Sequence, residues 1–460
     1  MPTFWTEYEK FWKHPETNAT NLRLKILLVI GIGSSLSQQR DTDPEFYSMV
    51  NQWVYAAQTW LSGPLEKDRL DIDGLQIYCL TILARQIFSI GADLVWISMG
   101  SLLFTAMQMG LHRDPKHLPS MSVLQAELRR RLWASILEML VQSSLDSAMP
   151  PKISFDEFDT EPPSNINDDD MDDMTIVIQS RPRDVYTKTS MQLMLLDSLQ
   201  TRLQVLQLLS GMQSEASYLD ALKLSSEITN AYRGSRKFLV ESEVHGVTPF
   251  HRNLLDYLVR RFMIPLHSPF ASKAQSDPLF HYSLKVSLDN ALAMVMPEPN
   301  EPFFQLMAIG GGWFREGIRC ATTIICLELI SQTESHLLED TLQQNSQRRE
   351  FLKKAIRDMI VMSTERIRQG ETNIKNHMFL SMILAHAEAL ELGASIDLMI
   401  ARSAKDSLEF CYGLLETQAG AVSFPTPNDT SPSSTNFSGG QADYGLDFDV
   451  EFFFPGTGLS

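Results

Sequence analysis

Apolar residues recur every three or four positions along most of this 460-residue chain. That spacing places them on one face of a helix, whereas the alternation of apolar and polar residues that is typical of strands occurs in few places. We therefore predict an all-α fold, a multi-helix body with seven or more helices before residue 200. Further helices are predicted at 217–240, 250–264, 280–295, 315–335, 348–370, 374–392 and 396–416.

One predicted helix, from Glu127 onward, has an especially broad apolar face. Leu128 and Leu132 are four residues apart and Trp133 lies beside them, which indicates packing inside a bundle. The helix is expected to end near Pro150, because two consecutive prolines remove backbone donors and disfavour the helical conformation before them.

An acidic, proline-punctuated segment, residues 154–173, follows this helix. It predicts an extended loop over the surface. Arg129, Arg130 and Arg131 are consecutive on the preceding helix and therefore point in different directions. We expect them to form ion pairs with the acidic segment, each worth about 0.2–1 kcal/mol where exposed. Contact of these arginines with DNA is the weaker interpretation.

Two shorter patterns predict turns and caps. A capped turn is expected at 112–115, with Arg113 and Asp114 paired nearby. A second set of helices should begin around Thr189, and Gly211 should provide a left-handed C-terminal cap.

Three consecutive glycines, residues 310–312, predict a loop that passes tightly against the helical body. Trp313, Phe303 and Phe304 lie close to them in the sequence. Because cavities between helices often bind small molecules, a ligand pocket lined by these aromatic residues is a hypothesis.

The composition changes abruptly after Gly420. Residues 421–440 are rich in Pro, Ser, Thr, Asn and Gly and bury too little apolar surface to offset the entropy of ordering, so we predict disorder. In the final stretch, acidic residues alternate with bulky apolar ones, which indicates an acidic amphipathic activation segment. Its acids are Asp443, Asp447, Asp449 and Glu451, and its apolar residues are Tyr444, Leu446, Phe448, Phe452, Phe453 and Phe454.

The net charge of -17 is concentrated in two places. Residues 154–173 carry nine acids and residues 406–460 carry eight, and neither stretch contains a base. The remaining 39 acids balance the 39 bases of the chain. Binding to DNA needs a basic patch that neutralises phosphates, so we expect this chain alone to bind DNA poorly.

The four cysteines are too few and too scattered for a disulfide framework or a zinc cluster, so we expect buried, reduced thiols at Cys79, Cys320, Cys326 and Cys411. Residues 94–111 form an uncharged run that reaches the lower length limit of a transmembrane helix. Polar residues at every third or fourth position favour a buried helix of a protein core instead.

No enzyme motif stands out. Gly31 and Gly33 are followed by Leu36 where a dinucleotide-binding loop needs its third glycine. Phosphate-binding loops, nucleophile elbows and paired-histidine zinc helices are missing from the sequence. We therefore expect no catalytic, cofactor-binding or metal-binding residue, and a protein that is not an enzyme.

Five strings of residues, in order, resemble the regulatory middle region of fungal-specific transcription factors. They are MPTFWTEYEKFW at the start, NLRLKILLVIGIGSSLS, AMQMGLHRDP at 106–115, ELRRRLWASILEMLVQSSLDSAMPPKIS at 127–154 and DEFDTEPPSN at 156–165. Each string alone is a weak signal, but their order and spacing are specific. The resemblance covers residues 1–200.

The resemblance divides the chain into three expected parts. Residues 1–200 correspond to the fungal transcription-factor middle region, and residues 201–420 are expected to form the C-terminal helical part of the same body. Residues 421–460 are expected to be the disordered linker and acidic aromatic tail.

The family's function is the expectation that follows. The resemblance implies a nuclear transcription regulator, an activator of a fungal metabolic gene cluster, secondary-metabolite clusters included. The expected partners are the transcription machinery or a coactivator, bound through Phe448 and Phe452 to Phe454 of the tail, and a second regulator chain in a homo- or heterodimer. No membrane partner is expected.

The family usually carries a zinc-binding cysteine cluster before its middle region, and this sequence opens directly at the Pro-Thr-Phe turn. Zinc is therefore expected only if such a cluster precedes residue 1, so that DNA would be bound through that domain or indirectly. Two alternatives stay open. One is a protein-binding regulator that pairs with a full-length relative and inhibits it; the other is a small-molecule-binding protein or an unrecognised enzyme.

Overall fold

The computed structural model describes residues 2–13, 19–37, 44–63, 66–211, 217–338 and 343–421. Within these residues it contains α-helices and short 3₁₀ turns and no strand, which confirms the predicted all-α fold. Residues Met1–Ala421 form one compact unit. Of the predicted disordered linker and acidic tail, residues 421–460, Ala421 is the last residue of a helix and the others lie outside the described residues.

Helices α2, α3 and α4 share an apolar core. Leu24 and Leu28 of α2, Val54 of α3, and Ile77 and Ala84 of α4 are buried together. The first six helices are α1 (Pro2–Lys13), α2 (Thr20–Ser34), α3 (Pro44–Leu61), α4 (Ile72–Ile87), α5 (Val95–Gln108) and α6 (Val123–Asp146). With α7 (Ser190–Asp197), seven helices precede residue 200, as predicted.

Helix α6 is the long helix predicted from Glu127. It begins four residues earlier, at Val123, because Ser122 and Gln125 form a capping box that satisfies the first free N–H groups. It ends at Asp146, ahead of Pro150 as predicted. The 43 residues from 147 to 189 lack α-helix and contain two 3₁₀ turns, at Phe155–Glu157 and Asp168–Asp170. The acidic segment is thus the extended loop that the sequence predicts.

Helix α5 contains the uncharged run. Leu102, Leu103 and Ala106 are fully buried, which agrees with a core helix, whereas Ile97 and Phe104 on the other face are exposed. Within the described residues, no helix combines the length and the apolar character that crossing a membrane requires.

A second group of helices packs against α6 and against one another. They are α8 (Leu199–Ser210), α9 (Tyr218–Glu241), α10 (Pro249–Arg260), α11 (Met263–Ala271), α12 (His281–Val295) and α13 (Glu301–Ile309). The predicted helix at 250–264 is two helices, α10 and α11, and α13 was not predicted. Its nine residues were too short for a clear apolar period.

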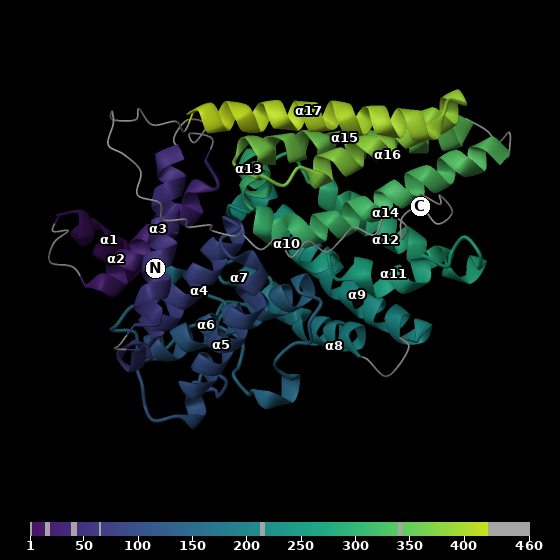
Figure 1. Ribbon diagram of the computed structural model, residues 1–460. Coiled ribbons are helices and arrows are strands. Elements are labelled where there is room, and N and C mark those ends of the chain that lie inside the picture. Colours follow the sequence, from purple (N-terminus) through teal and green to yellow (C-terminus); the bar gives the residue numbers. More distant parts are fainter. Residues whose placement is uncertain are drawn as a thin grey trace, which may run out of the picture. The chain divides into compact units, whose positions relative to one another are not determined.

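Four long helices complete the body: α14 (Gly311–Leu338), α15 (Gln343–Arg368), α16 (Lys375–Leu392) and α17 (Ile396–Ala421). Figure 1 shows α17 lying along α15 and α16 at one side of the body. Gln418 of α17 donates a hydrogen bond to the carbonyl of Ile367 at the end of α15, which fixes the register of the two helices.

Two glycine predictions were wrong. Gly211 ends α8 with φ -69° and ψ 112°, an extended conformation rather than a left-handed cap. Gly311 and Gly312 are the first residues of α14, so Gly310 alone separates α13 from α14 and no loop exists there. Close packing against other elements is found at Gly311, where a Cβ would lie 2.8 Å from Arg366 Nη2 and 3.1 Å from Ser89 Oγ.

Candidate functional site

The N-terminal half of α6 carries the three consecutive arginines, and each has a different partner. Arg129 donates to the Met109 carbonyl at the end of α5, at 2.6 Å. Arg130 donates two hydrogen bonds to Asp114, both 2.9 Å long. Arg131 pairs with Glu127 at 3.0 Å and with Asp168 at 2.5 Å. Arg131 thus forms the predicted ion pair with the acidic segment and Arg130 lies 3.8 Å from Glu161 of that segment, whereas Arg129 bonds to a backbone carbonyl instead.

Asp114 is the most completely satisfied of these carboxylates. It is fully buried and accepts hydrogen bonds from Arg130 and from the backbone N–H groups of Lys116 and Glu161. Burial alone would raise the pKa of Asp114, but these hydrogen bonds and the charge of Arg130 outweigh it and lower the pKa to about 2. The predicted capped turn at 112–115 exists, with Asp114 capping it and pairing with Arg130.

The segment 154–189, which we call the acidic strap, is bonded to the body through its N-terminal part, residues 159–168, and to itself further on. Glu127, fully buried, accepts from the backbone N–H of Ser164 at 3.1 Å, and Thr160 donates to the Leu111 carbonyl at 2.6 Å. The Asn165 side chain receives a hydrogen bond from Thr187 at 2.7 Å and donates to the Val185 carbonyl at 2.8 Å. The strap is therefore an ordered part of the fold.

The C-terminal half of α6 carries charges that the sequence analysis did not single out. Glu138 accepts two hydrogen bonds from Arg202 of α8, at 2.8 and 2.7 Å, and the Arg202 side chain is fully buried. Asp146 pairs with Arg261, which follows α10 and is also buried. Burial raises the pKa of Asp146, and the positive charge of Arg261 offsets this only in part. These pairs join α6 to the second group of helices.

A third charged cluster links α9, α10 and the residues after α12. Glu298 accepts from Arg252 at 2.7 Å and also pairs with Arg236. Arg236 in turn pairs with Asp256 at 2.6 Å, and Tyr232 donates to the same carboxylate at 2.6 Å. Each charged group thus has a partner of opposite sign, as in a network that holds helices in place.

These clusters contain no constellation for catalysis. In the described part of the chain, no group of three or more His, Cys, Asp and Glu side chains is placed to bind a metal ion. His267 and Ser283 are hydrogen-bonded at 2.9 Å, but both are fully buried and out of reach of a substrate. All four cysteines are free thiols; Cys326 and Cys411 are buried as expected, whereas Cys79 and Cys320 are only partly buried. Burial raises the pKa of Cys320 and of Cys326.

The hypothetical pocket beside the glycine triplet is filled by side chains at its centre. Phe303 is almost completely buried and makes edge-to-face contacts with Phe250 and Phe314, at centroid distances of 5.7 and 5.9 Å. Phe314 also contacts Tyr257, whose hydroxyl donates to the Trp313 carbonyl. Phe303 and Phe314 thus contribute to the core, whereas Phe304 and Trp313 are half-buried.

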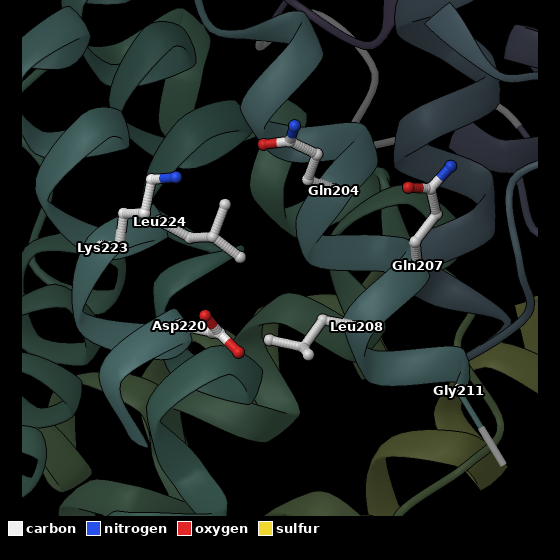
Figure 2. Close-up of a pocket in the computed structure, with 7 residues that line it drawn as sticks. All are labelled: Gln204, Gln207, Leu208, Gly211, Asp220, Lys223 and Leu224. Atoms are coloured by element: carbon white, nitrogen blue, oxygen red, sulfur yellow. The ribbon is translucent and has the colours of Figure 1, made fainter. Parts of the chain in front are cut away.

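An open pocket of about 400 Å³ lies between α8 and α9 (Figure 2). Figure 2 shows Asp220 of α9 and Leu208 of α8 pointing toward each other across it. Its lining residues are Gln204, Gln207, Leu208, Gly211, Asp220, Lys223 and Leu224. The lining combines two amides, a carboxylate, an ammonium group and two leucines, so the pocket offers both polar and apolar contacts.

The comparisons with known proteins agree with a regulatory scaffold. The family model of the fungal specific transcription factor domain matches residues 1–233. The match extends beyond residue 200, the limit of the resemblance seen in the sequence, and includes α8 and two thirds of α9. No solved structure matches the chain significantly.

Three curated relatives are transcription regulators by their names. Transcription factor asR3 of Sarocladium schorii is 44% identical over 98% of this chain and 58% of its own length. Transcription factor opdR of Penicillium oxalicum is 32% identical over 100% of this chain and 61% of its own length. The aspyridones cluster regulator apdR of Emericella nidulans is 29% identical over 89% of this chain and 57% of its own length. The chain thus spans a little over half the length of these relatives.

Proposed function

The chain belongs to the fungal-specific transcription factors, and from that premise we propose that it regulates transcription of a secondary-metabolite gene cluster in the nucleus. The observation that carries the proposal is the similarity to asR3 over 98% of the chain. Another relative, apdR, is by name the regulator of the aspyridones cluster. Like the relatives, the chain is proposed to act without catalysis.

We propose that the helical body, including residues 201–420, is the regulatory part and that the tail activates transcription. The paired charges of α6 support the first half of this proposal, because they fix the acidic strap and α8 in one arrangement. The alternation of acids with Phe448 and Phe452 to Phe454 supports the second, since an amphipathic segment of this kind can fold into a coactivator groove.

Deleting the gene in the source fungus tests the proposed target. Transcripts of one biosynthetic gene cluster should fall while those of unrelated clusters stay unchanged. Transcript levels that stay the same in every cluster, under conditions in which the protein is made, would contradict the proposal. A rise instead of a fall would favour the inhibitory regulator that pairs with a full-length relative.

Fusing the full chain to a heterologous DNA-binding domain tests the tail. Replacing Phe448, Phe452, Phe453 and Phe454 by alanine should abolish activation of a reporter gene if they bind a coactivator. The matched control replaces Phe424 and Phe437, which are aromatic residues of the same tail without neighbouring acids at every second position. Equal activation by both variants would exclude the proposed role of the acidic aromatic stretch.

A further inference from the structure

A second cavity, of about 410 Å³, lies between the acidic strap, α7 and α9. Its size is within the range of small-molecule sites, roughly 300–1,000 Å³. It is distinct from the pocket of Figure 2, with which it shares no residue. Its lining residues are Asn165, Arg183, Asp184, Ser190, Leu193, Met194, Asp197, Gly234, Ser235 and Phe238.

One side of this cavity is apolar and open. Leu193 and Met194 of α7 and Phe238 of α9 provide hydrophobic surface. Gly234 lies one turn before Phe238, is exposed, and a Cβ there would meet no atom within 4 Å. Neither the backbone nor the packing of α9 therefore requires glycine at this position, and its missing side chain leaves space beside the apolar surface.

The uncharged polar side chains of the cavity already have partners within the protein. Ser190 accepts from the Thr187 N–H at 2.8 Å, and Ser235 donates to the Ala231 carbonyl at 3.1 Å. Asn165 donates to the carbonyls of Pro182 and Val185, both at 2.8 Å, which holds the turn that carries Arg183 and Asp184. The cavity is therefore preformed, and a ligand would be recognised by the charged side chains that line it.

The balance of those charged groups is negative. Arg183 pairs with Asp197 at 3.6 Å, and Asp184 adds a second carboxylate, so two negative charges face one positive charge. Burial raises the pKa of Asp197, and the charge of Arg183 compensates only in part. The Asp197 side chain is 50% exposed, so a bound cation can reach its carboxylate.

We propose that this cavity binds an organic cation, an amine whose aromatic or aliphatic body contacts Leu193, Met194 and Phe238 while its ammonium group pairs with Asp197 and Asp184. The two acids come from different elements, α7 and the acidic strap, so one bound amine crosslinks them. Binding can be measured on the purified full chain and does not depend on the proposed role in transcription.

Dansylcadaverine, a fluorescent aromatic primary amine, is the probe, and anilinonaphthalene sulfonate, an aromatic anion, is its counterpart of opposite charge. Dansylcadaverine should bind saturably to the full chain, and Gly234→Phe should weaken its binding at least tenfold by filling the cavity. The matched control is Gly413→Phe, because Gly413 on α17 is also an exposed helical glycine with open space around it. No saturable binding, or equal loss in both variants, would overturn the proposal.

Asp197→Asn tests whether the cavity prefers a positively charged ligand, because it removes one negative charge from the lining. It should weaken dansylcadaverine about tenfold and leave the sulfonate unchanged or bound more tightly. Thermal unfolding of each variant shows that the chain remains folded, so a loss of binding reports the site itself. If Asp197→Asn leaves the amine affinity unchanged, or if the sulfonate binds in a manner that depends on Gly234, the cavity does not select a cation and the proposal is wrong.

Discussion

Each half of α6 contributes one residue to an ion pair between an arginine and a carboxylate with little solvent exposure, but the surroundings of the two carboxylates differ. Near the N-terminal half, Asp114 is surrounded by two backbone N–H groups and Arg130, and its pKa falls to about 2. At the C-terminal end, Asp146 has Arg261 as its partner, its Oδ2 atom has no hydrogen bond, and its pKa is raised.

The difference indicates that the number of hydrogen-bond donors around a carboxylate, set against its burial, determines whether its pKa falls or rises. Asp114 is stabilised as an anion because several donors replace the water that it lost. Asp146 is held mainly by one charge, so removing either partner leaves an uncompensated group. The first arrangement fixes the acidic strap, and the second joins α6 to the end of α10.

The largest effect is expected from Arg261→Met, which leaves Asp146 buried without its partner. The free energy of unfolding should fall by about 3–5 kcal/mol, as measured by urea denaturation at neutral pH. The double variant Arg261→Met with Asp146→Leu should recover most of the loss, because no charge then remains buried. A double variant as unstable as the single one would show that packing of Arg261 against Tyr257, rather than charge, dominates.

Asp114→Asn tests the ion pair at the N-terminal half of α6, in which the carboxylate accepts several hydrogen bonds. Because the pKa of Asp114 is lowered to about 2, its charge contributes stability above its unfolded pKa of about 3.9, and this contribution is lost as the pH falls toward 2. The variant should be about 2 kcal/mol less stable at pH 7 and approach the unmodified chain near pH 2. Urea denaturation at several pH values measures this convergence, and parallel curves would contradict it.

The smallest effect is expected from Arg113→Ala, which removes a pair with Asp159 at 3.2 Å on the surface of the same turn. The two side chains are 53% and 38% exposed, so the loss should be about 0.2–1 kcal/mol and should vanish at high salt. Thermal unfolding at low and high ionic strength measures it. If Arg113→Ala lowers the free energy of unfolding as much as Asp114→Asn does, solvent exposure does not explain the difference in stability between the two ion pairs.

Several parts of this picture could be predicted from the sequence because they depend on local physics. The period of Leu128 and Leu132 predicted α6, Pro150 limited its end, and proline-punctuated acids predicted the extended strap. The predictions failed where a short segment or a single glycine had to be judged, at α13, Gly211 and the start of α14, since neighbouring helices decide such positions.

By itself, the sequence determined the all-α fold, the family and the pairing of Arg130 and Arg131 with acids, because periodicity, motif order and charge are local properties. Only the tertiary structure decided that Glu138 meets Arg202, that Asp146 meets Arg261, and that Asp197 lies across a cavity from Gly234. These partners are far apart in the chain or on different elements, and the pKa of a carboxylate depends on the groups that folding brings around it.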